Sequence, residues 1–247
     1  MASYHDLFSI GKEYLEKVKN TQQGQIKVVA KMMGECMLDN GVVQLFGLNH
    51  NHAFTMEMFY RAGGLMPFHG FNPRDLVLRG IVTPSEFDKP DFLYRQDTVD
   101  KMWDIYNIQA NDMFVLASDL GIEGCVIDMA IKVKKHGHKL VVVTSLKEAQ
   151  KLKSKHPSGK KLYEFADVVI DSCIANPDVV LPLKNGVMIN QMATLTGNTI
   201  AQMITAETYK LLIDLGEEAP VLLSANVTGA DVHNRAISDK YLGRWNA

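Results

Sequence analysis

Two patterns of apolar residues alternate along most of this chain. Short continuous apolar runs indicate strands buried on both faces, and stretches with apolar residues every three or four positions indicate amphipathic helices. The predicted strands are residues 42–46, 112–117, 140–143 and 168–170, with short strands or edge pieces at 179–183 and 187–189. Buried strands that alternate with helices predict a parallel, doubly wound α/β sheet.

The helical pattern is strongest near both ends of the chain and after the central strand. The predicted helices are two within residues 4–38, then 54–65, 97–105, 126–135 and 192–215. The first two are expected to separate near Asn20, with Thr21 as the cap of the second. Residues 66–97 contain four prolines and no regular pattern. Long irregular segments often carry function, so we expect a lid or an excursion between subunits there.

These elements predict a single domain over residues 1–247, because no repeat or low-complexity linker divides the chain. Residues 1–40 are expected to form a helical pair and residues 41–215 the α/β core. Residues 216–247 are expected to form a tail that contributes to a site or an interface.

Composition narrows the possible partners. The net charge is −2, with 26 basic and 28 acidic residues, so neither a nucleic acid nor a membrane partner is expected. No apolar run approaches the roughly 20 residues of a spanning helix. The first residues lack the basic and apolar regions of a signal peptide, and the three cysteines are widely spaced. These features predict a soluble, cytoplasmic protein.

The segment after the first predicted strand is the leading candidate for a ligand site. Residues 47–52 read GLNHNH and connect this strand to a helix. A helix start presents free N–H groups, and in open α/β sheets ligands bind where strands end. Asn49, His50, Asn51 and His52 therefore predict binding of a small polar or anionic molecule.

Several stretches together resemble the sugar isomerase (SIS) domain family, and in particular its phosphoheptose-isomerase-like branch. They are EMFYRAGGL (57–65), VVVTSL (141–146), KHPSGKKLYEFADVVID (155–171), TLTG (194–197) and NVTGADVHNRAISDKYLGR (226–244). The resemblance implies a three-layer α/β/α fold with a flavodoxin-like, five-stranded parallel sheet, N-terminal helices and a C-terminal tail. It also implies a sugar derivative as ligand and a homodimer or homotetramer with shared sites.

The two phosphate loops depart from the family pattern. The first loop usually reads Gly-x-Gly-x-Ser, but Asn49 stands at the second Gly and Asn51 at the Ser. The second usually reads Ser-x-Ser-Gly, but residues 118–123 read SDLGIE. Fewer hydroxyl donors and new carboxylates, Asp119 and Glu123, weaken phosphate binding. We therefore expect a neutral polyol or a weaker anion, or a lost activity; alternatively, the carboxylates complement the dipole of the next helix.

Aldose–ketose isomerisation through an enediol needs groups that move protons between adjacent carbons and oxygens. His233, in the polar tail, is the first candidate, because in the wider family a tail His can reach a neighbouring subunit's site. Glu57 is the second; the family's catalytic Glu lies on this helix but by spacing falls nearer Arg61. The alternatives are a surface or capping role for His233, and a structural or interface salt bridge between Glu57 and Arg61.

The other candidates are polar residues of the predicted loops, including a second histidine segment with Ser158 and Lys160 nearby. The expected substrate-binding residues are Asn49, His50, Asn51, His52, Ser118, Asp119, Thr144, Ser145, His156 and Asn226. No cofactor and no metal are expected. A catalytic zinc site needs three protein ligands, and the sequence supplies at most two with certainty, His50 and His52.

The leading hypothesis is an SIS-type isomerase of a sugar derivative that works as a homo-oligomer. One alternative is a non-catalytic protein that binds a carbohydrate derivative. Another is lyase or deaminase chemistry on an amino sugar, whose amine Asp119 and Glu123 would attract.

Overall fold

The computed structural model describes residues 3–122 and 124–244, so Glu123 lies outside the described residues. Its centre is a parallel sheet of five strands in the order β2-β1-β3-β4-β5. The strands are β1 (Val43–Gly47), β2 (Phe68–Phe71), β3 (Met113–Ala117), β4 (Lys139–Thr144) and β5 (Val168–Asp171). The predicted flavodoxin-like sheet is thus confirmed. The strand order reverses at β1, which places the topological switch point between β1 and β3.

The central strands are continuous apolar runs because helices cover both faces of the sheet. Every residue of β1 and β3 is buried. Alternate side chains point to opposite faces, so Val43 and Leu45 join one core cluster while Phe46 joins the other. A strand with two buried faces has no polar period, which is why its sequence does not alternate.

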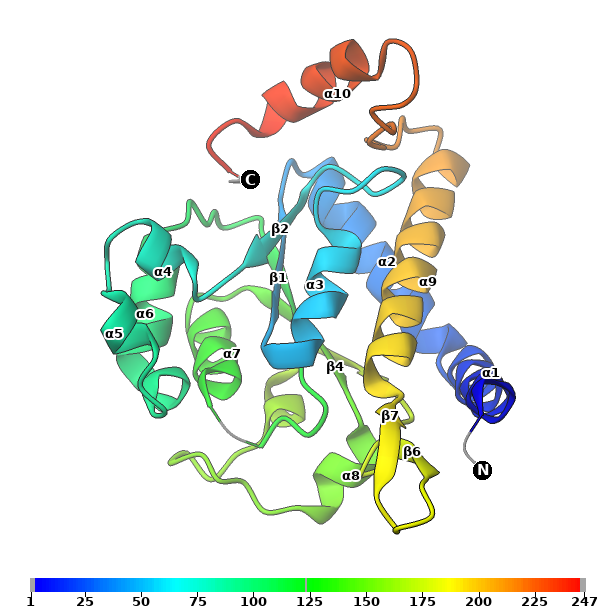
Figure 1. Ribbon diagram of the computed structural model, residues 1–247. Coiled ribbons are helices and arrows are strands. Elements are labelled where there is room, and N and C mark those ends of the chain that lie inside the picture. Colours follow the sequence, from blue (N-terminus) through cyan, green and yellow to red (C-terminus); the bar gives the residue numbers. More distant parts are fainter. Residues whose placement is uncertain (1–2, 123, 245–247) are drawn as a thin grey trace.

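Two helical layers enclose the sheet (Figure 1). One layer contains α1 (Tyr4–Thr21), α2 (Gln23–Leu38), α3 (His52–Met58) and α9 (Ala193–Asp214). The other contains α4 (Asp75–Leu78), α5 (Pro84–Phe87), α6 (Gln96–Asp104) and α7 (Cys125–Lys135), while α8 (Leu146–Lys151) follows β4. No helix of the described residues is long and apolar enough to cross a membrane.

The sequence predictions for helix ends were wrong at two places. Thr21 does not cap α2, because its hydroxyl donates 2.7 Å to the carbonyl of Lys17, and the N-cap residue is Gln22. The helix predicted over residues 54–65 ends at Met58. There the backbone becomes extended, and Leu65 instead forms a β-bridge with Val221.

The segment expected to be irregular contains the edge strand β2, the short helices α4 and α5, and the 3-10 helix η2 (Phe92–Tyr94). The strand follows Pro67 directly, which is tolerated because β2 lies at the edge of the sheet. His69 and Gly70 interrupt its apolar pattern, so the sequence reads as a loop.

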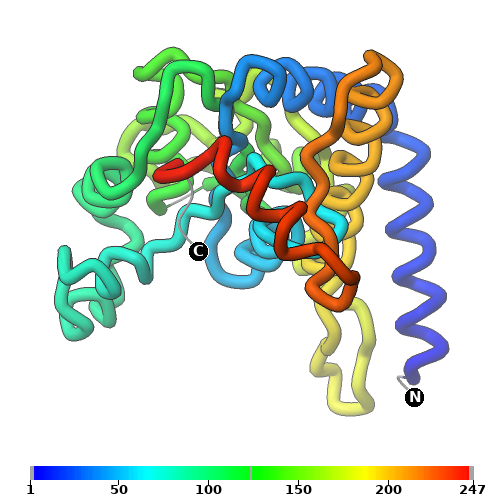
Figure 2. The backbone as a smooth tube through the Cα atoms, turned by 90° about the horizontal axis from the view of Figure 1, so that it is seen from above, coloured from blue at the N-terminus to red at the C-terminus, as the bar shows by residue number. Residues whose placement is uncertain are grey.

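Two further parts lie outside the five-stranded sheet. The short strands predicted near residues 179–189 form an antiparallel hairpin of β6 (Val179–Pro182) and β7 (Met188–Gln191). The tail contains α10 (Ala230–Ser238), which lies across one end of the molecule in Figures 1 and 2. Tyr241 packs there on Val42, the residue before β1, so the tail covers the amino ends of the strands.

Candidate functional site

The opposite, carboxyl ends of β1 and β3 open into a pocket of about 390 Å³. Three segments line it: the loop after β1, the end of β3 with the loop and helix start that follow it, and residues 87–94 from the end of α5 onward. The lining residues are Leu48, Asn49, Asn51, Phe87, Lys89, Pro90, Leu93, Tyr94, Ala117, Ser118, Gly124 and Val126. Three predicted site residues, Asn49, Asn51 and Ser118, therefore meet in one cavity.

The first loop turns sharply out of β1 into the 3-10 helix η1 (Asn49–Asn51). Gly47 allows this turn, because a Cβ there would lie 2.5 Å from the carbonyl oxygen of Asn51. Asn49 has φ +54°, a left-handed conformation that asparagine tolerates better than most residues. The turn places both asparagines at the pocket wall.

The second loop is held in place by its own backbone and by the chain after α8. The backbone N–H of Gly121 donates 3.2 Å to Oγ of Ser118, and the N–H of Leu162 donates 2.8 Å to the carbonyl of Gly121. Gly124 closes the loop at the start of α7 with φ +72°. A Cβ at Gly124 would lie 3.1 Å from the carbonyl oxygen of Leu93, so the third segment approaches this loop closely.

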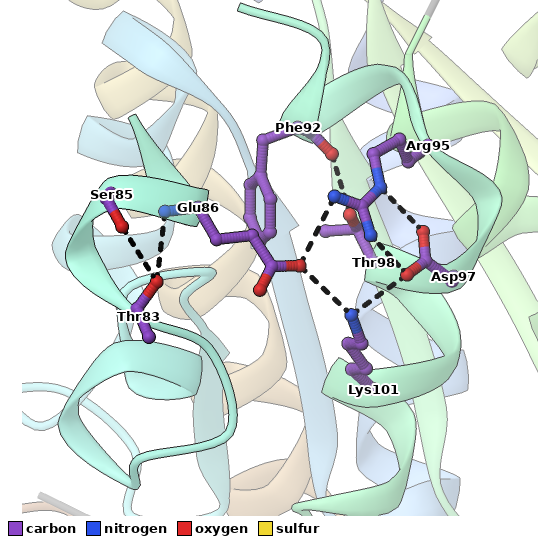
Figure 3. Close-up of polar contacts among 8 residues, drawn as sticks. All are labelled: Thr83, Ser85, Glu86, Phe92, Arg95, Asp97, Thr98 and Lys101. Carbon is purple, nitrogen blue, oxygen red and sulfur yellow. Dashed lines mark hydrogen bonds and ion pairs between the residues drawn. The ribbon is translucent and has the colours of Figure 1, made fainter. Parts of the chain in front are cut away.

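We call residues 84–94 the cover segment, because Phe87, Lys89, Pro90, Leu93 and Tyr94 supply one wall of the pocket. Its anchor in the core is Phe92, which is 1% exposed and whose carbonyl accepts a 2.6 Å hydrogen bond from Thr98 (Figure 3). Sequence reasoning expected a lid or an excursion within residues 66–97 but named none of these five residues as part of a site. The prolines of this region were the only signal.

Four charged side chains at the base of the cover segment form a network (Figure 3). Glu86 lies 3.2 Å from Arg95 and 3.4 Å from Lys101, and Asp97 lies 2.6 Å and 2.9 Å from the same two cations. Hydrogen bonds from Arg95 and then Lys101 hold the pKa of Asp97 far below its usual value. The network joins α5 to α6 and so ties the two ends of the cover segment together.

His50 and Asp119 form a pair across the two loops, although neither they nor His52 are among the lining residues of the pocket. Nε2 of His50 lies 2.5 Å from Oδ2 of Asp119, 3.3 Å from the amide nitrogen of Asn51 and 3.5 Å from that of Gln191. The hydrogen bond to Asp119 raises the pKa of His50, against an opposing effect of burial. The Asp119 carboxylate, expected to repel an anion, therefore has a cationic partner when His50 is protonated.

His52 has a different hydrogen-bond partner from His50. Its Nδ1 lies 2.9 Å from the hydroxyl of Thr55, within the same helix. Burial and then the nearby charge of Arg74 lower the pKa of His52. Within the described residues, no three His, Cys, Asp or Glu side chains are placed to share a metal ion.

Thr144 and Ser145, at the end of β4, are buried and do not line the pocket. The hydroxyl of Thr144 donates 2.9 Å to the carbonyl of Asp119, and that of Ser145 donates to the carbonyl of Ile174. The backbone N–H of Ser145 also donates 2.8 Å to the Asp119 carbonyl. Both residues therefore hold the second loop in place through the carbonyl of Asp119.

His156 supports the same loop from the other side. Its side chain is 9% exposed, and its ring lies 3.0 Å from Oδ1 of Asp128 on α7 and 2.8 Å from the hydroxyl of Ser158. The preceding residue, Lys155, donates a 2.8 Å hydrogen bond from its backbone N–H to the carbonyl of Ile122. His156 thus fixes the chain after α8 to α7 without reaching the pocket.

The two predicted catalytic residues lie away from the pocket of their own chain. Glu57 lies on α3, 3.2 Å from Arg61, and also accepts a hydrogen bond from Gln202 of α9. His233 lies on α10, with Nε2 2.9 Å from the carbonyl of Val221, and Asn226 lies in the exposed loop before it. Since α10 covers the amino ends of the strands, His233 can serve a pocket only in another chain of an assembly.

Comparisons with known proteins agree with this fold. Residues 8–145 match the family model of the SIS domain. A UPF0309 protein of Geobacillus sp. (strain WCH70) is 36% identical over 234 residues, which cover 94% of this chain and 93% of that protein.

Two solved structures, both phosphoheptose isomerases, are similar at 12% sequence identity and a TM-score of 0.56. The one from Neisseria gonorrhoeae covers 84% of this chain and 96% of its own. The one from Francisella tularensis covers 85% and 100%. At this identity the likeness concerns the fold alone, whereas the domain match and the relatives concern the sequence. The chain belongs to the SIS domain family and, within it, to the UPF0309 proteins.

Proposed function

We propose that this protein binds a sugar derivative in the pocket at the ends of β1 and β3 and interconverts its aldose and ketose forms. The observation that carries the proposal is the meeting of Asn49, Asn51 and Ser118 in one cavity at the switch point of the sheet. The volume of about 390 Å³ lies within the usual range for small-molecule sites.

The chemistry of the pocket walls suits a sugar. Amide side chains such as Asn49 and Asn51 both donate and accept hydrogen bonds, as vicinal hydroxyls require. Phe87 and Tyr94 offer aromatic surface on the facing wall, against which the C–H groups of a sugar ring can pack. Polar and apolar lining residues thus match the two kinds of surface that a sugar presents.

The charges favour a neutral or singly charged head group. Lys89 is the one charged side chain among the described residues that line the pocket. A phosphate dianion is usually held by several donors, and Ser118 supplies the one serine or threonine hydroxyl among the described residues that line the pocket. A hydroxyl, an amide or a carboxylate is better matched to one lysine and two asparagines.

The catalytic part of the proposal is tested by deuterium exchange. NMR follows the incorporation of solvent deuterium at the carbon next to the sugar carbonyl. Suitable probes are glucose, mannose, arabinose, N-acetylglucosamine and glucose 6-phosphate. We expect exchange with at least one unphosphorylated probe, and its loss in Asn51→Leu. Saturable binding without exchange would instead assign a carbohydrate-binding role, and neither binding nor exchange would contradict the proposal.

The homodimer or homotetramer expected for this protein is tested by light scattering. Mixing His233→Ala chains with Asn51→Leu chains then asks whether the tail of one chain serves the pocket of another. Recovery of activity in the mixture would support a shared site.

A further inference from the structure

We propose that His50, oriented by Asp119, is the base that moves the proton between adjacent carbons. This inference rests on the isomerase function proposed above and names the residue that performs its central step. It differs from the sequence-based expectation, which assigned this step to His233 and Glu57.

The first argument is position. His50 belongs to η1 at the end of β1, and Asp119 lies two residues beyond the end of β3. These strands are direct neighbours, with Gly47 opposite Ala117 in the register. Their carboxyl ends flank the switch point, where ligands of open α/β sheets bind. His50 is not itself among the lining residues of the pocket, but its two neighbours, Asn49 and Asn51, are.

The second argument is the state of the imidazole ring. Its Nε2 lies 2.5 Å from a carboxylate oxygen of Asp119, so Nε2 carries a hydrogen and donates it. In the neutral ring the lone pair is then on Nδ1, which makes no hydrogen bond to any residue that the structure describes. The side chain of His50 is 33% exposed, so this nitrogen is accessible to a ligand. A carboxylate that fixes the tautomer of a histidine base is a recurrent catalytic arrangement.

The third argument is electrostatic. The charged groups that face His50 among the described residues are Asp119, from the loop after β3, and Asp178, just before β6. Both stabilise the protonated ring, whereas partial burial opposes it. A base whose pKa lies near the working pH is the most effective, and the hydrogen bond to Asp119 raises the pKa of His50.

The proton step balances without any further cofactor. The C–H bond next to the carbonyl breaks, its electron pair forms the C=C bond of the enediol, and the proton goes to Nδ1 of His50. The carbonyl oxygen takes a proton from water. The ring then returns its proton to the former carbonyl carbon, and the neighbouring hydroxyl loses its proton to water and becomes the new carbonyl.

The competing candidates are already engaged within the chain. Nε2 of His233 lies 2.9 Å from a backbone carbonyl, and the carboxylate of Glu57 contacts Arg61 and Gln202. Neither lines the pocket of its own chain. His50 and Asp119 are not among its lining residues either, but they belong to the two loops that supply Asn49, Asn51 and Ser118 to it.

The test measures deuterium exchange, with the five sugar probes above, in wild type and four variants. We expect His50→Gln to lose exchange by about 100-fold or more while its melting temperature stays close to wild type. His136→Gln is the matched control, because this exposed histidine stacks on Trp103 at the far end of α7. It should keep full exchange.

Asp119→Asn separates a positioning effect from a structural one. Removal of the carboxylate lowers the pKa of His50, so the rising limb of the pH–rate profile should move to lower pH as the maximal rate falls. An NMR titration of the His50 ring in both proteins reports the same shift without any substrate.

The outcomes distinguish the two proposals. Exchange retained in folded His50→Gln would overturn the role of His50 while the isomerase function stands, and its loss in His233→Ala at the same time would assign the step to the tail histidine. No exchange by wild type with any probe would overturn both. An unchanged pH profile and ring titration in Asp119→Asn would overturn the role of Asp119.

Discussion

The guanidinium of Arg244, in the tail, donates a hydrogen bond to Oδ1 of Asp112 at the start of β3. The side chain of Asp112 is 0% exposed, and it also accepts hydrogen bonds of 2.9 Å from the backbone of Val42 and the amide of Gln44. The tail is thereby joined to a buried polar group of the sheet.

Arg244→Ala should lower the free energy of unfolding by about 3 kcal/mol, because it leaves a buried carboxylate without its counter-ion. Urea denaturation measures the change. Arg235→Ala, at an exposed position on α10, is the control and should be nearly neutral. Equal stability of the Arg244 variant and wild type would contradict the structural role of this pair.

His69 should make the protein sensitive to acid. Burial lowers its pKa to about 4, and Nε2 has no hydrogen-bond partner among the described residues. Between pH 6.5 and 4 the unfolded state therefore binds more protons than the folded state, so stability falls as the pH drops through this window. The expected loss is on the order of 3 kcal/mol. Unfolding curves for His69→Gln should show a smaller slope there, and an identical slope would refute the assignment.

Gly124→Ala should disturb the pocket. The conformation of Gly124, φ +72° and ψ −172°, is almost exclusive to glycine, and the new methyl group would also press on the carbonyl of Leu93. We expect a loss of about 1–3 kcal/mol in stability and weaker ligand binding. Gly159→Ala is the matched control, since Gly159 also has a positive φ but no atom within 4 Å of its Cβ. Both variants strain the backbone, but only Gly124→Ala presses on the cover segment. The difference between their calorimetric stabilities therefore measures the effect of that contact.

Inorganic phosphate should bind weakly. At millimolar concentration we expect it to leave the melting temperature of wild type almost unchanged, because Asn49 and Asn51 replace the glycine and hydroxyl of the family's phosphate loop. The double variant Asn49→Gly/Asn51→Ser should gain a measurable upward shift. Strong stabilisation of wild type by phosphate would show that backbone donors alone suffice.

The sequence predicted the central strands well because these are buried on both faces and leave a plain apolar run. It missed β2, where Pro67, His69 and Gly70 hide a strand that only the edge of a sheet tolerates. The resemblance to a known family implied five strands without placing the fifth. Strands were thus predictable where burial on both faces leaves a continuous apolar run. They were not predictable where single residues such as a proline or a glycine interrupt that run.

The candidate site was predictable only in part, for a related reason. Asn49 and Ser118 could be placed together because neighbouring parallel strands end side by side. The sequence could not show that Thr144 turns its hydroxyl to a backbone carbonyl, nor that His50 pairs with Asp119, since both depend on side-chain direction. The irregular pattern marked residues 66–97 as a candidate lid, but it could not show which of them reach the pocket, because the position of the cover segment depends on one buried aromatic, Phe92.

The path of the tail has a consequence for how the molecule comes apart. Asn234 exchanges two hydrogen bonds with the backbone of Leu223, and Val221 pairs with Leu65, so contacts hold both sides of the exposed loop 225–229. A protease that cuts this loop would leave two fragments bound to each other. The nicked protein would still melt in a single transition, and the C-terminal fragment would dissociate only when the sheet itself unfolds.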